Sequence, residues 1–202
     1  MRVLTLNLFN EWSTWAVRRA MIVGEIGRLR PEVLALSEVG IGLGHGHWLR
    51  WALEESEGLC YALHEAREPG PAERATGQAL LTSLPVLETA SVHLGDTSQV
   101  ALAARILSGG ATVEVYVTHL YGRLGREYDR LREDQARSLL AWIASRESAT
   151  ARVACGDFNA VPESRVVKLM MDKFYPTQTS PTAFTPLKGA RDRPTQHQLP
   201  RM

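Results

Sequence analysis

The sequence predicts an α/β fold in one domain, on three observations. Short apolar runs that are typical of buried strands occur along the chain together with longer segments whose apolar residues repeat every three to four positions, as in helices. The chain has 202 residues and is 45% hydrophobic, which suits one domain with a sizeable core. No internal repeat and no domain boundary breaks residues 1–175, so we expect these residues to form that domain.

The predicted strands share a short apolar run that is bounded by polar residues, glycine or proline. The run over 32–38 is mostly apolar, which favours a strand that is covered on both faces. The pair Gly109-Gly110 lies between two such runs and predicts a hairpin. In chain order, the predicted strands are 3–6, 32–38, 59–63, 77–82, 86–93, 100–107, 112–117 and one that ends at 151–153.

Three longer segments are expected to be helical. Residues 15–30 show helical spacing, and Pro31 closes the segment. A second helix is expected near 47–57, a third over 126–146, and a short one over 163–172.

The helix expected over 126–146 has the clearest pattern, with a single apolar stripe along one side. Its opposite face carries both signs of charge: Arg126, Glu127, Asp129, Arg130, Arg132, Glu133 and Asp134. Mixed charge favours a solvated face with ion pairs over a face that binds nucleic acid.

Three segments have the composition of loops. Residues 66–76 are rich in Glu, Arg, Gly and Pro, which predicts a surface loop. The glycines over 40–46 do not have the spacing of a dinucleotide-binding loop, so we expect a flexible turn; the alternative is a substrate-side loop with His45 and His47 at its rim. Residues 176–202 hold five of the ten prolines and lack strand periodicity, which predicts an irregular tail.

The composition bounds the class of protein. The formal net charge is +1, which neither demands nor excludes a polyanionic partner. The two cysteines, Cys60 and Cys155, lie in apolar runs and are expected to be buried free thiols in a reducing compartment. The N-terminal segment is too short and too polar for a signal peptide, and no apolar run has the length of a membrane span. A cytoplasmic protein without a transmembrane segment is expected.

A carboxylate and an amide, Asp157 and Asn159, follow the last predicted strand. Residues two apart in an extended or tightly turned backbone point the same way, so both side chains would face one point, with Phe158 turned to the core. Gly156 permits a sharp bend before them, and Pro162 prevents a return to the strand. Such a pair suits a hard cation beside a phosphate oxygen.

Polar residues end three further strands, namely Asn7, Glu38 and His119. If the strands form layered sheets, these ends can converge with Asp157 and Asn159 on one rim. The chemistry would be hydrolysis of a phosphoester with Mg²⁺ or Mn²⁺ bound by Glu38. Asp157 would activate water, while Asn7 and Asn159 would position the site. His119 would donate to a phosphate oxygen.

At these positions the sequence resembles the endonuclease/exonuclease/phosphatase family, the DNase I-like superfamily. The resemblance covers about residues 1–165, and its motifs occur in the family's order and spacing. The segments that carry it are Leu6-Asn7, Ala35–Val39, Gly77–Val86, Val117–Leu120 and Gly156–Pro162, with Arg132 and Gln135 in the long helix.

The resemblance implies a four-layer α/β/β/α sandwich of two mixed sheets flanked by helices. It also implies a divalent-metal phosphodiesterase or phosphomonoesterase, with Glu38 as metal ligand and Asn7 as its neighbour. His119 would contact phosphate, and Asp157 and Asn159 would serve the water and the phosphate. The substrate class stays open among nucleic acid, phospholipid and small phosphoesters.

The sequence departs from the family pattern at its end. The family closes with an Asp-Tyr-Ile-like strand and a Ser-Asp-His motif, and neither occurs here. Asp192 and His197 are the nearest residues that could replace them. The departure implies a C-terminally incomplete fold, with an exposed sheet edge that could support a homo-oligomer. The alternative function is therefore a catalytically impaired or inactive family member that acts as a binding protein.

Overall fold

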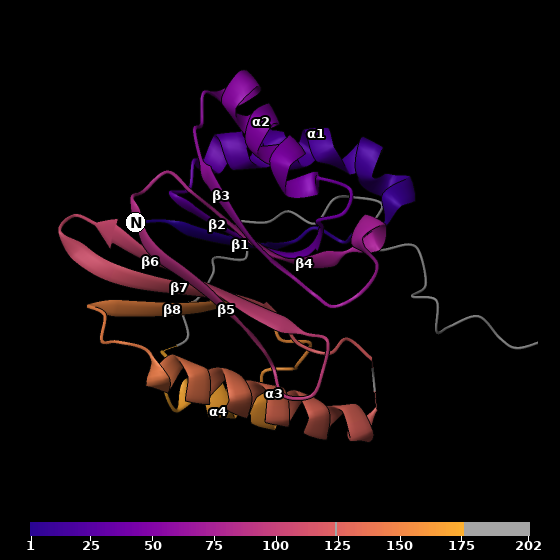
Figure 1. Cartoon of the computed structure of the whole chain (residues 1–202), viewed down its shortest axis with the longest axis vertical. Helices are drawn as coiled ribbons and strands as arrows, with labels where there is room; N and C mark the ends of the chain where they lie inside the picture. The colour runs from indigo at the N-terminus through magenta and orange to yellow at the C-terminus, as the bar shows by residue number, and fades with distance from the viewer. Residues whose placement is uncertain (124, 176–202) are drawn as a thin grey trace, which may run out of the picture.

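Two four-stranded sheets face each other in the computed structural model, which describes residues 1–123 and 125–175. Its elements are β1 Val3–Asn7, α1 Trp12–Leu29, β2 Val33–Gly40, α2 His45–Glu57, β3 Ala62–Arg67, the 3-10 helix η1 Ala72–Arg74, β4 Thr76–Thr82, β5 Val86–His93, β6 Val100–Ser108, β7 Ala111–His119, α3 Arg126–Ser145, β8 Ala151–Asp157 and α4 Arg165–Met171. Helices α1 and α2 cover one sheet, and α3 and α4 cover the other (Figure 1). The predicted four-layer sandwich of two mixed sheets is confirmed.

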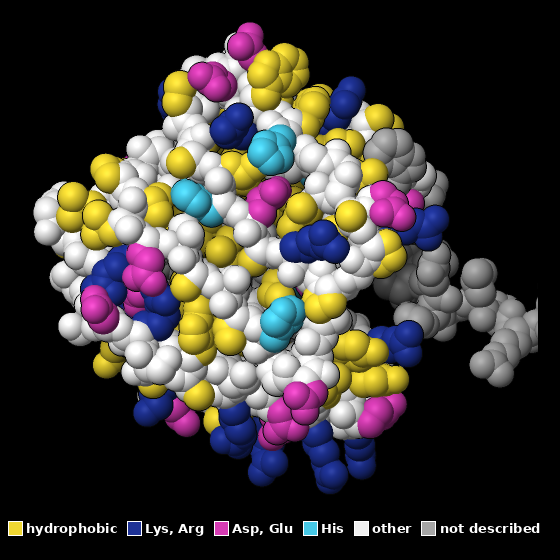
Figure 2. All heavy atoms as spheres, in the orientation of Figure 1, with side chains coloured by type: hydrophobic (Ala, Val, Ile, Leu, Met, Phe, Trp, Pro, Cys, Tyr) yellow, Lys and Arg dark blue, Asp and Glu magenta, His cyan; other side chains and the backbone are white. Residues whose placement is uncertain are grey.

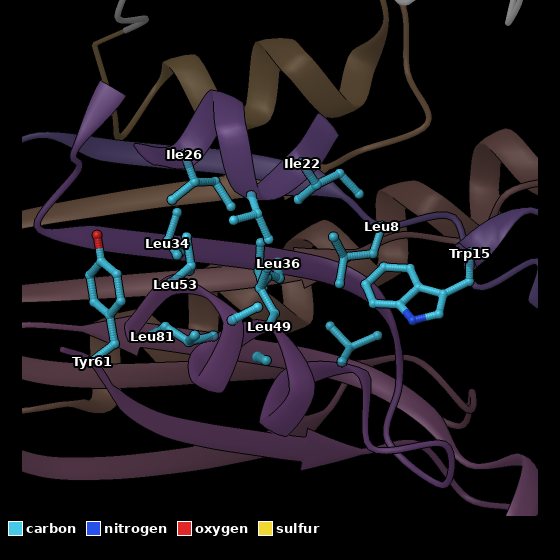
Figure 3. Close-up of a cluster of buried hydrophobic side chains, with 14 residues drawn as sticks. Leu8, Trp15, Ile22, Ile26, Leu34, Leu36, Leu49, Leu53, Tyr61 and Leu81 are labelled. Atoms are coloured by element: carbon cyan, nitrogen blue, oxygen red, sulfur yellow. The ribbon is translucent and has the colours of Figure 1, made fainter. Parts of the chain in front are cut away.

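The first sheet has the strand order β1-β2-β4-β3, in which only β1 and β2 run parallel. Strand β2 is buried along almost its whole length, as its apolar sequence predicts. Its side chains alternate: Leu34 and Leu36 face α1 and α2, whereas Val33 and Ala35 face the second sheet. Figure 3 shows the core between this sheet and its two helices.

The second sheet has the order β5-β6-β7-β8, in which only β7 and β8 run parallel. Val115 and Val117 of β7 pack between the sheets. Tyr116, which lies between them, faces the opposite way and meets Trp142 of α3 edge-on, with ring centroids 5.6 Å apart. Both faces of β7 are therefore covered.

The parallel pairs bring four strand ends to one edge of the sandwich. Asn7 at the end of β1 lies opposite Ser37 of β2, and His119 at the end of β7 lies opposite Asp157 of β8. The pairing of β2 with β4 is interrupted between Leu36 and Val39, where a β-bulge contains Glu38. A bulge redirects a side chain out of the regular alternation, and here the residue is an acidic one.

The third strand begins later than the sequence predicts. Strand β3 starts at Ala62 rather than near residue 59, because the backbone N–H of Leu59 caps α2 by donating to the carbonyl of Leu53. The strand then runs into the predicted loop over 66–76, because it pairs with β4 as far as Arg67. The cap of α2 sets the start of β3 and pairing with β4 sets its end, and the apolar residues of the strand reveal neither.

Several side chains lie elsewhere than predicted. Cys60 is exposed rather than buried, because it follows the end of α2 and precedes the paired part of β3, whereas Cys155 is half-buried and burial raises its pKa to about 12. Arg132 is buried rather than on the solvated face of α3. His45 is buried in the first turn of α2 rather than at a rim, while His47 is exposed.

Other expectations remain open. The segment 176–202, with Asp192 and His197, lies outside the described residues. Strands β1 and β8 are sheet edges within the described part of the chain, and self-association through such an edge stays a prediction. Among the same residues, no helix is both long and apolar enough to cross a membrane.

His45 is a buried imidazole, and neither of its ring nitrogens has a hydrogen-bond partner among the residues that the structure describes. Its ring stacks on Trp15 with centroids 4.1 Å apart. Burial lowers the pKa of His45, and the charge of Arg18 lowers it further. The unfolded chain therefore takes up a proton at this residue at a pH where the folded protein does not.

Below pH 6.5, the ordinary pKa of histidine, we expect acidification to destabilise His45→Phe less than it destabilises wild type. Between 6.5 and the lowered pKa, the unfolded state binds the extra proton, so the free energy of unfolding falls as pH falls, by up to about 1.4 kcal/mol per pH unit. Phenylalanine can keep the stack on Trp15 but takes up no proton. Urea denaturation at several pH values from about 7.5 to about 5.5 measures the slope. Equal slopes for the two proteins would contradict the expectation; His64, whose pKa burial also lowers, is present in both.

Candidate active site

The side chains of Asn7, Glu38 and Asp157 meet at one edge of the sandwich, and both sheets contribute residues there. The side-chain amide of Asn7 donates to Glu38 Oε1 at 2.8 Å and to Asp157 Oδ2 at 3.1 Å. The oxygen of that amide accepts a hydrogen bond from the N–H of Phe9 at 2.8 Å, which fixes the orientation of the amide. One amide thus holds side by side two carboxylates from strands of different sheets.

His119 and Asn159 complete the cluster. Asp157 Oδ1 accepts a hydrogen bond from the backbone N–H of Asn159 at 2.9 Å, as in an Asx turn. The amide nitrogen of Asn159 lies 2.8 Å from the Leu120 carbonyl and 2.8 Å from His119 Nε2. Only the nitrogen end can donate to that carbonyl, so the same NH2 group faces Nε2, and we assign Nε2 as the acceptor in this arrangement. His119 Nε2 also lies 3.8 Å from Glu38 Oε1 and 4.0 Å from Asp157 Oδ2.

The structure therefore brings together all the site residues that the strand ends predict: Asn7, Glu38, His119, Asp157 and Asn159. Phe158 turns the other way and packs against the core beneath α3 and α4. The chemical role of each residue stays a prediction.

Backbone strain concentrates at this cluster. Phe9, Glu38 and Asn159 have φ values of 46°, 50° and 47°. Such left-handed conformations cost of order 1–3 kcal/mol in a non-glycine residue, and they persist where the surroundings enforce them. Among the described non-glycine residues with positive φ, only Arg30, which ends α1, lies elsewhere. This distribution is typical of a functional site.

Arg18 of α1 holds the loop that follows Asn7. Its guanidinium donates to the carbonyl of Leu8 at 2.7 Å and to that of Phe9 at 2.6 Å. Sequence reasoning assigned Arg18 no role in the site. The available signal was an arginine within the apolar stripe of the first helix.

Arg132 and Gln135 of α3 hold the loop that follows β7. Arg132 donates to the carbonyls of Tyr121 and Arg123 at 2.8 and 2.7 Å. Gln135 accepts a hydrogen bond from the N–H of Tyr121 at 3.0 Å. These contacts explain why Arg132 is buried. Its guanidinium donates to the carbonyls of Tyr121 and Arg123, which would otherwise lie beneath α3 without a hydrogen-bond partner.

Glu68 is a third carboxylate near the cluster, and sequence reasoning missed it. Its side chain accepts a hydrogen bond from the hydroxyl of Thr76 at 3.0 Å. Burial raises the pKa of Glu68, and the hydrogen bond from Thr76 partly offsets that effect. Thr76 pairs with Gly40, two residues beyond Glu38 in β2, and the charges of His119 and Glu38 also act on the pKa of Glu68. The composition around Glu68 indicates only a surface loop, so the local sequence does not predict that this carboxylate lies near the site.

The donor atoms suit a hard divalent cation that keeps most of its water. Among the described residues, no three or more His, Cys, Asp or Glu side chains are grouped so as to hold a metal ion. The cluster instead offers two carboxylates, Glu38 and Asp157, whose side chains are 25% and 38% exposed. Mg²⁺ commonly uses one or two carboxylates together with several waters. The residues are thus compatible with Mg²⁺ or Mn²⁺.

Other surfaces give less indication of function. A shallow cleft of about 500 Å³ lies beside Ala62 and Thr82, at the end of the first sheet away from Asn7, and none of the predicted site residues lines it. Figure 2 shows basic and acidic side chains together along the lower edge of the viewed face, where Figure 1 places α3. Both signs of charge therefore occur along the edge that α3 and α4 form.

A model of the Endonuclease/Exonuclease/phosphatase family matches residues 4–193. Nocturnin from Drosophila melanogaster is 30% identical over 164 residues, a match that covers 75% of this chain and 25% of that protein. The chain thus spans a quarter of the length of this curated relative.

Solved structures show the same fold. The human Nocturnin catalytic domain with bound sulfate anion has a TM-score of 0.71 at 26% identity, covering 86% of this chain and 69% of that one. ANGEL2, a 2',3'-cyclic phosphatase, has a TM-score of 0.70 at 23% identity, covering 84% and 56%. D. rerio TDP2 complexed with single strand DNA product has a TM-score of 0.65 at 17% identity, covering 84% and 64%. The last two likenesses show the fold alone.

Proposed function

The chain belongs to the endonuclease/exonuclease/phosphatase family, and from this membership we propose that it is a metal-dependent phosphoesterase that hydrolyses its substrate with water. One observation carries the proposal: the amide of Asn7 joins Glu38 to Asp157, with His119 Nε2 within 4.0 Å of both carboxylates. Two carboxylates, an imidazole and two amides lie at one rim. The carboxylates can bind a cation, and the imidazole and an amide can donate hydrogen bonds to a phosphate group.

Glu38 would hold Mg²⁺ or Mn²⁺, and Asn7 would keep the carboxylate of Glu38 in place. Asn7 as a direct metal ligand stays a prediction, because its oxygen accepts the N–H of Phe9. The bound cation would act as a Lewis acid and offset charge that develops on the phosphoryl oxygens. Asp157 would orient the attacking water and accept its proton, since Oδ2 is the atom that faces Asn7 and His119.

Asn159 and His119 would bind the phosphate. They hydrogen-bond to each other in the structure, so a phosphate oxygen would replace that contact. The amide of Asn159 would donate directly to the phosphate oxygen. His119 would donate from Nε2 once its ring carries a second proton, and both hydrogen bonds would strengthen as negative charge builds up.

The substrate remains a proposal as well. We propose a nucleic-acid phosphoester rather than a phospholipid; among the neighbours that share the fold are a 2',3'-cyclic phosphatase and a protein bound to single strand DNA product. We also propose that residues 1–175 form the catalytic unit and that the protein acts in the cytoplasm.

Hydrolysis of bis-p-nitrophenyl phosphate and of plasmid DNA tests the proposal. Wild type is expected to turn over with Mg²⁺ or Mn²⁺ and to stop in EDTA. Asp157→Ala is expected to lower the rate roughly 10²–10⁴-fold, because it removes the residue that handles the water's proton. Asp134→Ala, at an exposed position of α3, is the matched control.

Two outcomes would count against the hydrolase. Cleavage that persists both in EDTA and in Asp157→Ala would place the chemistry elsewhere. Folded wild type without turnover in either metal would favour the alternative, a binding protein that retains the site without catalysis.

A further inference from the structure

The loops that leave β1 and β7 repeat one arrangement on two sides of the candidate active site. Each begins with a site residue, continues with a leucine that is 0% exposed and then reaches an aromatic residue: Asn7-Leu8-Phe9 and His119-Leu120-Tyr121. Leu8 packs in the core beneath α1 and α2, and Leu120 packs in the core beneath α3. The two aromatic residues are thus anchored from opposite outer layers of the sandwich.

Phe9 is 55% exposed, although its backbone is held in a strained conformation with φ 46°. Its N–H donates to Asn7 Oδ1 at 2.8 Å, and its carbonyl accepts a hydrogen bond from Arg18 at 2.6 Å. The guanidinium of Arg18 also lies over the ring, 5.4 Å from its centroid. The charge of Glu38 also acts on the pKa of Arg18, which burial lowers.

Tyr121 is fixed in a parallel way from α3. Its N–H donates to Gln135 at 3.0 Å, and its carbonyl accepts a hydrogen bond from Arg132 at 2.8 Å. The ring rests against Tyr128, with centroids 5.1 Å apart, and remains partly exposed. An arginine of the outer helix therefore holds the carbonyl of the aromatic residue on each side of the site.

We propose that Phe9 and Tyr121 stack on the nucleobases on either side of the scissile phosphate of a single-stranded nucleic acid. The inference rests on the proposed phosphoesterase function and specifies its substrate class. A single strand presents a flat base on each side of every internal phosphate, and aromatic side chains accept any base because every base has a π-face. A phospholipid has no such group, and in a duplex the bases are already stacked on one another. Fixed aromatic rings lose little conformational freedom on binding, which favours this use.

Equilibrium binding in EDTA tests the inference without competing hydrolysis. The probes are fluorescein-labelled oligothymidylate, oligouridylate and an oligomer of abasic tetrahydrofuran sites with the same number of phosphates. Wild type is expected to bind both base-bearing oligomers at least about tenfold more tightly than the abasic one. Phe9→Ala and Tyr121→Ala are each expected to weaken binding of the base-bearing oligomers roughly 5–150-fold and to leave the abasic oligomer unaffected. A difference between the thymidylate and uridylate oligomers distinguishes DNA from RNA as the source of the bases.

Two further variants separate stacking from folding. Phe9→Trp keeps an aromatic ring and is expected to retain wild-type affinity. Trp51→Ala removes an aromatic side chain that is 56% exposed on α2 and is expected to change nothing. Equal affinity of wild type for base-bearing and abasic oligomers would overturn the inference, and so would a loss confined to only one of the two alanine variants. Base-dependent binding by a protein that cleaves no phosphodiester would uphold the stacking and reject the phosphoesterase.

Discussion

Glu38→Gln is expected to lower metal-dependent hydrolysis by roughly 10²–10³-fold or more. Several kcal/mol of transition-state stabilisation depend on the cation, and each 1.4 kcal/mol corresponds to about tenfold in rate. Glutamine keeps the shape of the side chain and an oxygen that can accept the 2.8 Å hydrogen bond from Asn7. The substitution therefore removes the negative charge while the backbone bulge and the core around it remain.

The measurement is the rate of bis-p-nitrophenyl phosphate hydrolysis as a function of Mg²⁺ and Mn²⁺ concentration. The variant is expected to require a higher metal concentration, and its thermal unfolding is expected to match that of wild type. Glu55→Gln, at an exposed position of α2, controls for the loss of one negative charge. An unchanged metal requirement in Glu38→Gln would remove Glu38 from the metal site.

Gly156→Ala is expected to destabilise the fold by about 2–5 kcal/mol and to abolish the arrangement of the site. Gly156 has φ 125°, a region that other residues rarely adopt, and a Cβ at this position would overlap the carbonyl oxygen of Thr118. Since Thr118 pairs with Gly156 in the parallel ladder of β7 and β8, the methyl group would push the two strands apart. The next pair along that ladder is His119 with Asp157.

Urea denaturation and the hydrolysis assay together check this prediction. A free-energy change of this size lowers the midpoint of thermal unfolding by roughly 4–20 °C in a chain of this length. Gly24→Ala is the matched control: Gly24 is exposed within α1 and a Cβ there meets nothing within 4 Å. It is expected to raise stability by about 0.5–1 kcal/mol, because alanine favours a helix. A neutral effect of Gly156→Ala would show that β7 and β8 can tolerate a side chain between them.

Much of the fold was predictable because its signals are local. The apolar run over 32–38 reads as a doubly covered strand, and β2 is indeed buried on both faces. Asn7, Glu38, His119 and the Asp157/Asn159 pair stand out because each follows or interrupts such a run. Polar residues at strand ends are visible without knowing which strands are neighbours.

Errors arose where distant segments decide the structure. The cap of α2 decides where β3 begins and pairing with β4 decides where it ends, and the apolar residues of the strand decide neither. The sequence predicts Arg132 on the solvated face of its helix, but its guanidinium is buried because it donates to the carbonyls of Tyr121 and Arg123. Glu68 lies near Glu38 only because it bonds Thr76, which pairs with Gly40 of β2 across the sheet.

The sequence by itself determined which strands and helices form, the family of the chain and the residues that make up its candidate site. Periodicity and motif order are properties of short segments, so they can be read along the chain. The tertiary structure alone decided that Asn7 bonds Asp157, 150 positions away, that a bulge presents Glu38, and that Arg18 and Arg132 hold the flanking loops. These contacts depend on strand register and layer packing, which arise only when the whole chain has folded.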